Sequence, residues 1–295
     1  MMSNAVMRLS LATGTSVAAQ VCVAGGGARP KCLLLHGNPG SLADFRWLVP
    51  LLSSALDLVA IDLPGFGQSA RPDPKPEALE LERLAEHAMA VADLLAWKEP
   101  YFLIGHSHGG GVAQVAAARY PDRIAGLVLL ATLGAPAHGS YRLLSAPGAE
   151  TTVRVAGAML RARRLPALSR WVLGRVMRDM FLPEPVPSDR LESELNQFAE
   201  RPEILVSMVH VALGKPCAKL LETAPDIRCP TLFLHGAADA LVPVACARAI
   251  HERIAGAGGS SRFEVVPGAG HMLLEQRASE VAAQVLAHVS REHAS

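Results

Sequence analysis

The sequence is short of cysteine and has no cysteine pattern that indicates a disulfide framework or a metal cage. Its five cysteines are odd in number, widely scattered and form no CxxC pair. A disulfide-stapled domain or a zinc site normally shows closely and regularly spaced cysteines. Buried free thiols are therefore expected. The five positions are Cys22, Cys32, Cys217, Cys229 and Cys246.

The chain also lacks an excess of one charge and a long hydrophobic run. It has 28 Lys and Arg against 27 Asp and Glu, so the net charge of +1 gives no overall reason to expect nucleic acid or an anionic membrane as partner. The longest apolar run, around residues 124–133, is well short of a membrane span. The first twenty residues carry only Arg8 and have polar interruptions, unlike a signal peptide. These absences predict a soluble, cytoplasmic protein with no membrane span.

What the chain does have is the composition of a globular protein of one large or two small domains. Half of its 295 residues are apolar and 19% are charged. Two strand-like stretches, Met7–Leu11 and Val17–Val23, flank Thr-Gly-Thr and predict a hairpin. Six short, continuously apolar runs follow, typical of strands that are covered on both faces. They are residues 31–37, 56–62, 101–107, 124–131, 231–236 and 262–268.

Helical patterns alternate with these strands. Such alternation predicts an α/β fold with a mostly parallel central sheet and helices on both faces. In such sheets the loops at the carboxyl ends of the strands form the functional site. The expected helices are Leu42–Ser54, Leu79–Trp97, Gly109–Tyr120, Pro243–Ile254 and Arg277–Ser290.

The alternation stops over residues 134–225. This stretch contains several amphipathic helical patterns punctuated by prolines, and no convincing strand. It predicts an inserted helical cap. The expected organisation is a core domain in two parts, residues 1–133 and 226–295, with the cap at 134–225 between them.

The stretch "FLIGHSHGGG" places Ser107 at a sharp turn between a strand and a helix. The chain comes close to neighbouring backbone two residues before and after the turn, where Gly105 and Gly109 have no side chain to clash. The turn lifts the hydroxyl clear of the sheet and places the following N–H groups at a helix N-terminus, where an oxyanion is favoured. Ser107 is therefore a candidate nucleophile.

A serine nucleophile needs a base, and His271 is the best candidate. It lies in a glycine-rich loop after the last predicted strand, while Asp239 lies just beyond the preceding strand end and can orient the imidazole. The order Ser107, Asp239, His271 is that of nucleophile, acid and base in this architecture. His106 and His108 neighbour the serine in a tight turn, so neither easily faces it. We expect His106 to pack or hydrogen-bond inside and His108 to line the pocket or cover the edge of the sheet. With no carboxylate at close spacing, a zinc pair is rejected.

A second oxyanion donor is expected from the loop "HGNPG" at the end of another strand. The N–H of Asn38 can supply it, since Pro39 has none. His36 is interpreted as a structural hydrogen-bonding residue.

With these motifs the sequence resembles the α/β-hydrolase superfamily over nearly its whole length. The matching motifs are His36 to Gly40, Asp62 to Ser69, Gly105 to Gly110, His235 to Asp239 and Gly270-His271. The resemblance implies Ser107 as nucleophile, His271 as base, Asp239 as orienting acid, and backbone donors at Asn38 and His108. "HGNP" resembles haloalkane dehalogenases, but those and epoxide hydrolases use an aspartate nucleophile, so Ser107 argues against both. A lidded serine esterase, thioesterase or carbon–carbon hydrolase is implied.

One glycine motif is rejected as a cofactor site. Gly65, Gly67 and Ala70 formally match the dinucleotide fingerprint, which requires a helix to begin there. Prolines 72, 74 and 76 follow instead. No NAD site, no other cofactor and no metal are expected.

The predicted cap has an arginine-rich segment, residues 151–181. One interpretation is docking of an anionic carrier, such as a coenzyme A thioester, or of a membrane surface. The other is a solvated outer face whose arginine stems cover apolar surface. His210 lies within reach of a substrate pocket without an assigned role. The inner packing of the cap is expected from Met159, Trp171, Met177, Met180, Met208 and Val209.

The resulting hypothesis is a cofactor-independent serine hydrolase of a small to medium, largely apolar ester or thioester, acting through an acyl-enzyme. Two alternatives stay open. One is hydrolysis of a carbon–carbon bond in a ketone or β-diketone with the same triad. The other is a binding or biosynthetic accessory protein that retains the hydrolase fold to hold a ligand.

Overall fold

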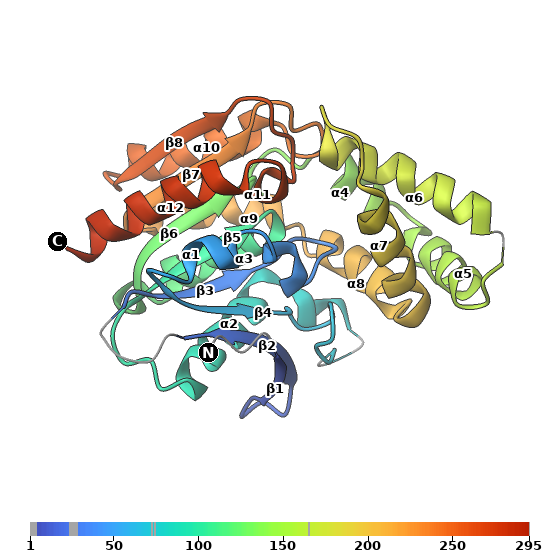
Figure 1. The fold of residues 1–295 in the computed structure, drawn as a ribbon, viewed down its shortest axis with the longest axis horizontal. Coiled ribbons are helices and arrows are strands. Elements are labelled where there is room, and N and C mark those ends of the chain that lie inside the picture. Colours follow the sequence, from blue (N-terminus) through green and yellow to red (C-terminus); the bar gives the residue numbers. More distant parts are fainter. Residues whose placement is uncertain (1–4, 24–28, 72, 74, 165, 295) are drawn as a thin grey trace.

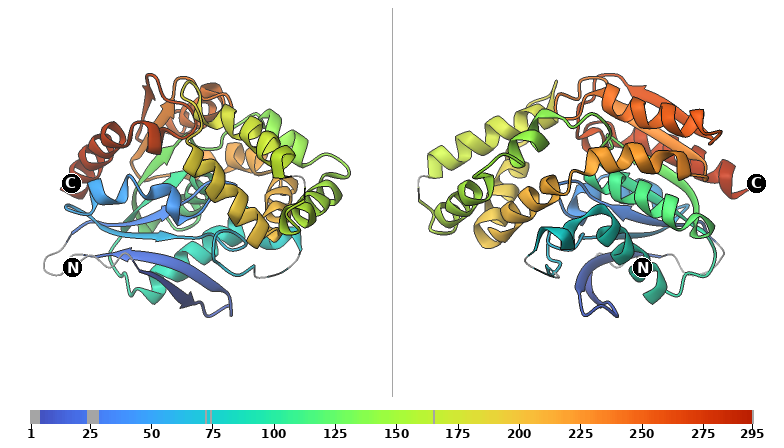
Figure 2. Two further views of the ribbon diagram at one scale, coloured as in Figure 1. Left: turned by 45° about the vertical axis from the view of Figure 1, so that its right-hand side comes forward. Right: turned by 180° about the vertical axis from the view of Figure 1, so that it is seen from behind.

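An eight-stranded sheet forms the centre of the molecule (Figures 1 and 2). The computed structural model describes residues 5–23, 29–71, 73, 75–164 and 166–294. The strand order is β1-β2-β4-β3-β5-β6-β7-β8. The strands are β1 (Val6–Ser10), β2 (Ser16–Cys22), β3 (Lys31–Leu35), β4 (Asp57–Ile61), β5 (Tyr101–His106), β6 (Ile124–Leu130), β7 (Thr231–Gly236) and β8 (Ser261–Val266).

Six of the eight strands run parallel. Strand β2 pairs antiparallel with both β1 and β4, whereas the pairs from β4 through β3, β5, β6 and β7 to β8 are all parallel. The predicted hairpin and the mostly parallel α/β sheet are therefore confirmed. Because the six strands share one direction, their carboxyl ends meet at a single edge of the sheet.

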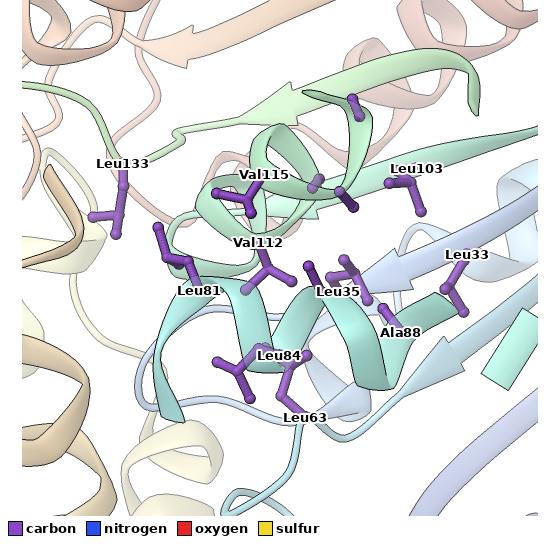
Figure 3. Close-up of a cluster of buried hydrophobic side chains, with 14 of the residues drawn as sticks. Leu33, Leu35, Leu63, Leu81, Leu84, Ala88, Leu103, Val112, Val115 and Leu133 are labelled. Atoms are coloured by element: carbon purple, nitrogen blue, oxygen red, sulfur yellow. The ribbon is translucent and has the colours of Figure 1, made fainter. Parts of the chain in front are cut away.

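Helices cover both faces of the sheet. Helices α2 (Leu81–Leu94), α3 (His108–Arg119) and α10 (Val244–Gly256) bury apolar side chains on one face. Helices α1 (Val49–Leu52), α11 (Leu273–Gln276) and α12 (Ala278–His293) do so on the other. Figure 3 shows the first layer, in which the leucines of α2 and the valines of α3 meet Leu33 and Leu35 of β3.

Alternate residues of one strand enter the two layers, because side chains of a strand point to opposite faces. In β3, Leu33 and Leu35 join the first layer, while Cys32 and Leu34 join the second. All four are fully buried. This two-sided burial is the physical reason why the strand sequences are apolar throughout rather than alternating.

The predicted helix Leu42–Ser54 is wrong in detail, because the structure divides it. Residues Leu42–Phe45 form the 3₁₀ helix η1, which begins with a capping box of Ser41 and Asp44. The short α1 follows, with Pro50 in its first turn. The proline ring would clash with the carbonyl four residues earlier, at Arg46, so a continuous helix cannot pass through. The prediction for 79–97 also divides, into η2 (Pro76–Leu79) and α2.

Helices alone occupy the described part of the chain between β6 and β7. Figure 1 shows α5, α6, α7 and α8 grouped beside the carboxyl edge of the sheet. Helix α9 instead packs against α3 and α10 of the sheet-covering layer. Whether residues 134–225 form a cap domain of their own stays a prediction. The helices are α4 (Gly139–Leu144), α5 (Ala149–Arg161), α6 (Pro166–Phe181), α7 (Ser188–Glu200), α8 (Glu203–Leu213), α9 (Pro216–Thr223) and η4 (Ala224–Asp226).

Among the described residues, no single helix has the length and apolar composition needed to cross a membrane. The helices Glu203–Leu213 and Pro216–Asp226 meet that criterion only as a pair, with a bend of 48° between them.

Candidate active site

The predicted site residues lie at the ends of different strands, on one edge of the sheet. Ser107 directly follows β5, Asn38 follows β3, Asp239 follows β7 and His271 follows β8. All four strands belong to the parallel part of the sheet. The fold thus gathers at this edge residues that are far apart in the sequence.

Ser107 occupies a strained turn that its glycine neighbours make possible. Its φ of 51° and ψ of −116° place it outside the usual regions for a residue with a side chain. A Cβ on Gly105 would lie 2.5 Å from the carbonyl oxygen of Gly109, and a Cβ on Gly109 would clash with the Leu35 and His36 carbonyls. The turn therefore requires glycine at both positions, and it places Ser107 immediately before α3.

Asp239 and His271 form a buried hydrogen-bonded pair. The two side chains meet through Nδ1 of His271 and Oδ2 of Asp239 at 2.8 Å. Burial alone would raise the pKa of Asp239, but the nearby His271, hydrogen bonds from His235 and His271, and the charge of His235 lower it well below its usual range. Asp239 is thus a carboxylate, an acceptor only, so Nδ1 of His271 carries the proton. In the neutral ring this leaves Nε2 of His271 as the basic nitrogen.

The Asp239 carboxylate is itself held in place by its own turn. Its Oδ1 accepts the backbone N–H groups of Leu241 at 3.0 Å and Val242 at 2.8 Å. His235 at the end of β7 has Nε2 3.1 Å from Oδ2 of Asp239. The same nitrogen donates to the Val242 carbonyl at 2.8 Å. Although the motif His235 to Asp239 was recognised, the sequence did not predict this bracing role of His235.

His106 and His108 are both buried and uncharged. Burial, followed by the proximity of His271, lowers the pKa of His106 to about 3. Burial, followed by His36, lowers that of His108 to about 3. Nε2 of His106 donates to the backbone carbonyl of His271 at 3.0 Å, so His106 supports the loop that carries the other histidine. The expected inward hydrogen bonding of His106 is confirmed. Within the described chain, no cluster of three or more potential metal ligands occurs.

The loop after β3 lies against the Ser107 turn. A Cβ on Gly37 would lie 3.1 Å from Cβ of Ser107. The Leu63 N–H donates to Nε2 of His36 at 2.8 Å, so the proton of that ring is on Nδ1, which donates to the Gly37 carbonyl at 2.7 Å. His36 is thus the structural hydrogen-bonding residue that was predicted, and it fixes the loop preceding Asn38.

Tyr141, which sequence reasoning did not single out, connects the two predicted oxyanion residues. Its hydroxyl accepts a hydrogen bond from Nδ2 of Asn38 at 3.4 Å and lies 3.3 Å from Nδ1 of His108. Burial raises the pKa of Tyr141, so its side chain is a phenol that shares a hydrogen bond with Nδ1 of His108. Nε2 of His108 and Oδ1 of Asn38 are then buried without a partner among the described residues. As one of only three tyrosines, at the start of the predicted cap, Tyr141 offered a weak signal in the sequence.

A cavity of about 390 Å³ lies among the helices beside the site. Its lining is almost entirely apolar and comes from α5, α6, α7 and α8, with Pro39 of the β3 loop. Met208 of α8 also lines it, and its carbonyl accepts a hydrogen bond from Nδ2 of Asn38 at 3.5 Å. Ser107, Asp239 and His271 are not part of the lining, and Pro39 is the residue of the loop after β3 that contributes to it.

Several predictions for the cap need correction. Met177 and Val209 are buried as expected, but Met159 is 42% and Trp171 is 68% exposed. Met159 lines the cavity and is still exposed, whereas Trp171 is not part of the lining, which the spacing of apolar residues alone could not reveal. His210 is not part of the cavity lining; it contacts Arg71 and Glu150.

The rejected dinucleotide motif has a structural role. Both carboxylate oxygens of Asp62 accept backbone N–H groups at 2.7 Å, from Leu42 and Gln68. A Cβ on Gly67 would clash with this carboxyl. In the described residues after Ala70, the next helix is η2, which begins at Pro76. Within the described residues, no helix begins directly after the motif, as the dinucleotide fingerprint would require.

Comparison with known proteins is consistent with this fold. The sequence matches the family model of the alpha/beta hydrolase fold over residues 33–278. The chain therefore belongs to the α/β-hydrolase family, as its motifs indicated. It is similar to a thermophilic esterase from Thermogutta terrifontis of solved structure, with a TM-score of 0.73, 23% identity and coverage of 98% of this chain and 99% of that one.

Curated relatives include proteins of different activities. A dihydrolipoyllysine-residue acetyltransferase component of an acetoin cleaving system from Pseudomonas putida is 29% identical over 91% of this chain and 65% of its own length. A pimeloyl-[acyl-carrier protein] methyl ester esterase from Chromobacterium violaceum is 28% identical over 77% of this chain and 83% of its own. The chain spans less than two thirds of the length of the first relatives that it matches.

Proposed function

We propose that this α/β hydrolase is a cofactor-independent serine hydrolase acting on a small to medium, largely apolar ester or thioester. Ser107 attacks the carbonyl carbon while Nε2 of His271 takes its proton. The N–H groups of Asn38 and His108 stabilise the oxyanion, and Asp239 stabilises the imidazolium. His271 then donates the proton to the departing alcohol or thiol. Water, deprotonated by His271, releases the acyl group from Ser107.

One observation carries this proposal: a serine in a strained turn at a helix N-terminus shares a sheet edge with a buried Asp239–His271 pair. A serine needs an activating base, and a base needs a partner that fixes its tautomer. The unpartnered Oδ1 of Asn38 and Nε2 of His108 add polar groups available to a ligand. The esterase names of relatives point in the same direction.

The substrate class rests on the cavity. Small-molecule sites are typically apolar clefts of roughly 300–1,000 Å³ with few polar groups. The 390 Å³ cavity fits that description and reaches the Asn38-Pro39 loop. An apolar acyl or alcohol group in the cavity would leave the carbonyl beside the oxyanion loop, which favours esters and thioesters with one extended apolar portion.

The first experiment is covalent labelling with a fluorophosphonate probe, followed by intact mass measurement. The wild-type protein should gain one probe, whereas Ser107→Ala and His271→Ala should gain none or react several orders of magnitude more slowly. A surface variant, Ser290→Ala, serves as the matched control and should label like wild type. Absence of labelling in folded wild-type protein would contradict the proposed nucleophile.

A substrate panel then separates the open alternatives. Esters and thioesters of increasing acyl length are compared with β-diketones at equal concentration. Preference for esters or thioesters supports the proposal, whereas faster cleavage of β-diketones identifies a carbon–carbon hydrolase with the same residues. Stoichiometric, tight capture without turnover identifies a ligand-binding protein.

A further inference from the structure

The outward surface of α5 and α6 exposes large apolar side chains. Across the described residues fifteen large apolar side chains are exposed, and six of them lie on these two helices, each between 42% and 68% exposed. On α6, Leu168, Val172 and Val176 follow one another every four residues, with Trp171 beside them. A cluster of this kind on a soluble surface marks an interaction site. The six are Val155, Met159, Leu168, Trp171, Val172 and Val176, here called the α5–α6 surface.

The same segment is strongly basic. Residues 151–178 contain seven arginines and no aspartate or glutamate. All seven are exposed. Four of them form ion pairs with acidic residues outside 151–178. Arg163, Arg164 and Arg178 have no acidic partner within ion-pair distance in the described part of the chain. The apolar surface is therefore flanked by uncompensated positive charge.

The apolar cavity opens at this surface. Met159, Leu168, Val172 and Val176 line the cavity and are also among the exposed side chains. Helices α5 and α6 both pack on α7 and lie far from β1 and β2 (Figure 1). A partner that covers the α5–α6 surface would thus cover a route to the cavity.

We propose that the α5–α6 surface docks on an anionic lipid bilayer. Helices that lie at a bilayer interface bury Trp, Leu and Val among the acyl chains and pair Arg with anionic headgroups. The observed surface combines Trp171, Leu168 and Val172 with arginines on the same two helices. Docking there would place the mouth of the cavity on the membrane. This last consequence rests on the proposed hydrolase function, whereas docking itself does not.

Two other occupants fit the charges less well. In a symmetric dimer this surface would meet itself, which would bring two arginine-rich surfaces together. An anionic carrier needs basic groups that converge on its phosphates. Arg164 instead precedes α6 and Arg178 lies in its last turn, so the rise of the helix separates them by about 20 Å. Such spacing suits a lipid surface with many headgroups.

Vesicle co-sedimentation tests the proposal. The Ser107→Ala protein, which would not turn lipid over, is mixed with phosphatidylcholine vesicles with and without 30% (about one lipid in three) phosphatidylglycerol. We expect binding to the anionic vesicles, and its loss at high salt. Arg163→Gln/Arg164→Gln/Arg178→Gln should weaken binding about a hundredfold, because each basic residue contributes about fivefold. The control Arg228→Gln/Arg253→Gln/Arg291→Gln, on the opposite parts of the core, should bind like its parent.

Fluorescence of Trp171 locates the contact. In a Trp47→Phe/Trp97→Phe background, Trp171 is the single tryptophan, and its emission should shift to the blue with anionic vesicles. A protein that keeps only the exposed Trp47 should show no shift. Equal binding of both arginine variants, or an unchanged Trp171 emission, would overturn the proposal. Two further results, each without vesicle binding, would also overturn it. One is a concentration-dependent dimer that Trp171→Ala abolishes. The other is saturable binding of coenzyme A that the core control retains and the α5–α6 arginine variant loses.

Discussion

The histidines around the site differ in which ring nitrogen carries the proton, because their hydrogen-bond partners differ. His271 donates from Nδ1 to a carboxylate, which leaves Nε2 basic. His36 carries its proton on Nδ1 because Nε2 accepts from Leu63, and His106 donates from Nε2 to the His271 carbonyl. All three rings are buried. Identical side chains thus have different chemistry, because each environment fixes one tautomer.

Tyr141 gives the first residue-scale prediction. Because its hydroxyl bonds both Asn38 and His108, Tyr141→Phe would free both residues of the proposed oxyanion hole while keeping the aromatic packing. We expect kcat to fall about thirtyfold with little change in KM, the effect of losing two neutral hydrogen bonds of about 1 kcal/mol each. Ester hydrolysis and the rate of fluorophosphonate labelling measure it.

The matched control is Tyr120→Phe. Tyr120 lies at the carboxyl end of α3, and its side chain is partly exposed. It should leave both rates unchanged. Equal losses in the two variants would show that Tyr141 acts only through general stability, and an unchanged kcat in Tyr141→Phe would show that it does not position the site.

At the scale of elements, a buried ionic cluster joins α7 to the core. Arg190 of α7 lies 2.5 Å from Asp44 of η1 and 3.0 Å from Glu194 on its own helix. It also approaches Glu275 of α11, which binds Arg46 at 2.8 Å. Helix α11 follows His271 closely along the chain, so the cluster ties α7 to the loop of the proposed base.

Removing Arg190 should destabilise the fold strongly. Arg190→Ala leaves the buried carboxylate of Asp44 without its countercharge, which typically costs about 3–5 kcal/mol. Arg170, in contrast, pairs with Glu192 at an exposed site. Arg170→Ala should cost at most about 1 kcal/mol. Urea denaturation measures both free energies of unfolding, and equal effects would contradict the clamping role of Arg190.

At the scale of the whole molecule, Glu194 makes stability depend on pH. Burial raises its pKa to about 7, although Arg190 opposes the rise. In the unfolded chain a glutamate titrates near pH 4.3. A folded pKa above the unfolded one means that the unfolded state loses its proton first, so the contribution of Glu194 to stability is greatest below about pH 4 and is lost as pH rises through about 7.

Glu194→Gln, which keeps the shape and cannot ionise, should therefore lose less stability than wild type between about pH 5 and pH 8. Thermal unfolding at several pH values measures the difference, which should grow with pH. Glu192→Gln, on the exposed face of the same helix, is the control and should run parallel to wild type. Parallel curves for Glu194→Gln would show that its carboxyl does not titrate in this range.

The sequence by itself determined the layers of the molecule and the place of Ser107. Continuous apolar runs report burial on both faces, because every side chain of such a strand meets a helix layer. The glycines around Ser107 indicate close backbone contacts, since any Cβ there would clash. These are local consequences of chain geometry, so they can be read from short stretches. Pro50 was a local signal that the predicted helix Leu42–Ser54 is interrupted, but the prediction did not take it into account.

Only the tertiary structure decided which distant residues meet. Asp239 bonds to His271 across 32 positions, Tyr141 joins Asn38 to His108, and Arg190 reaches Asp44. It also decided that Trp171 faces outward, because an amphipathic pattern does not say which side of a helix its neighbours cover. Hydrogen-bond partners, burial and the pKa values that follow from them depend on distances between segments, and those distances exist only once the sheet and the helices between β6 and β7 have packed.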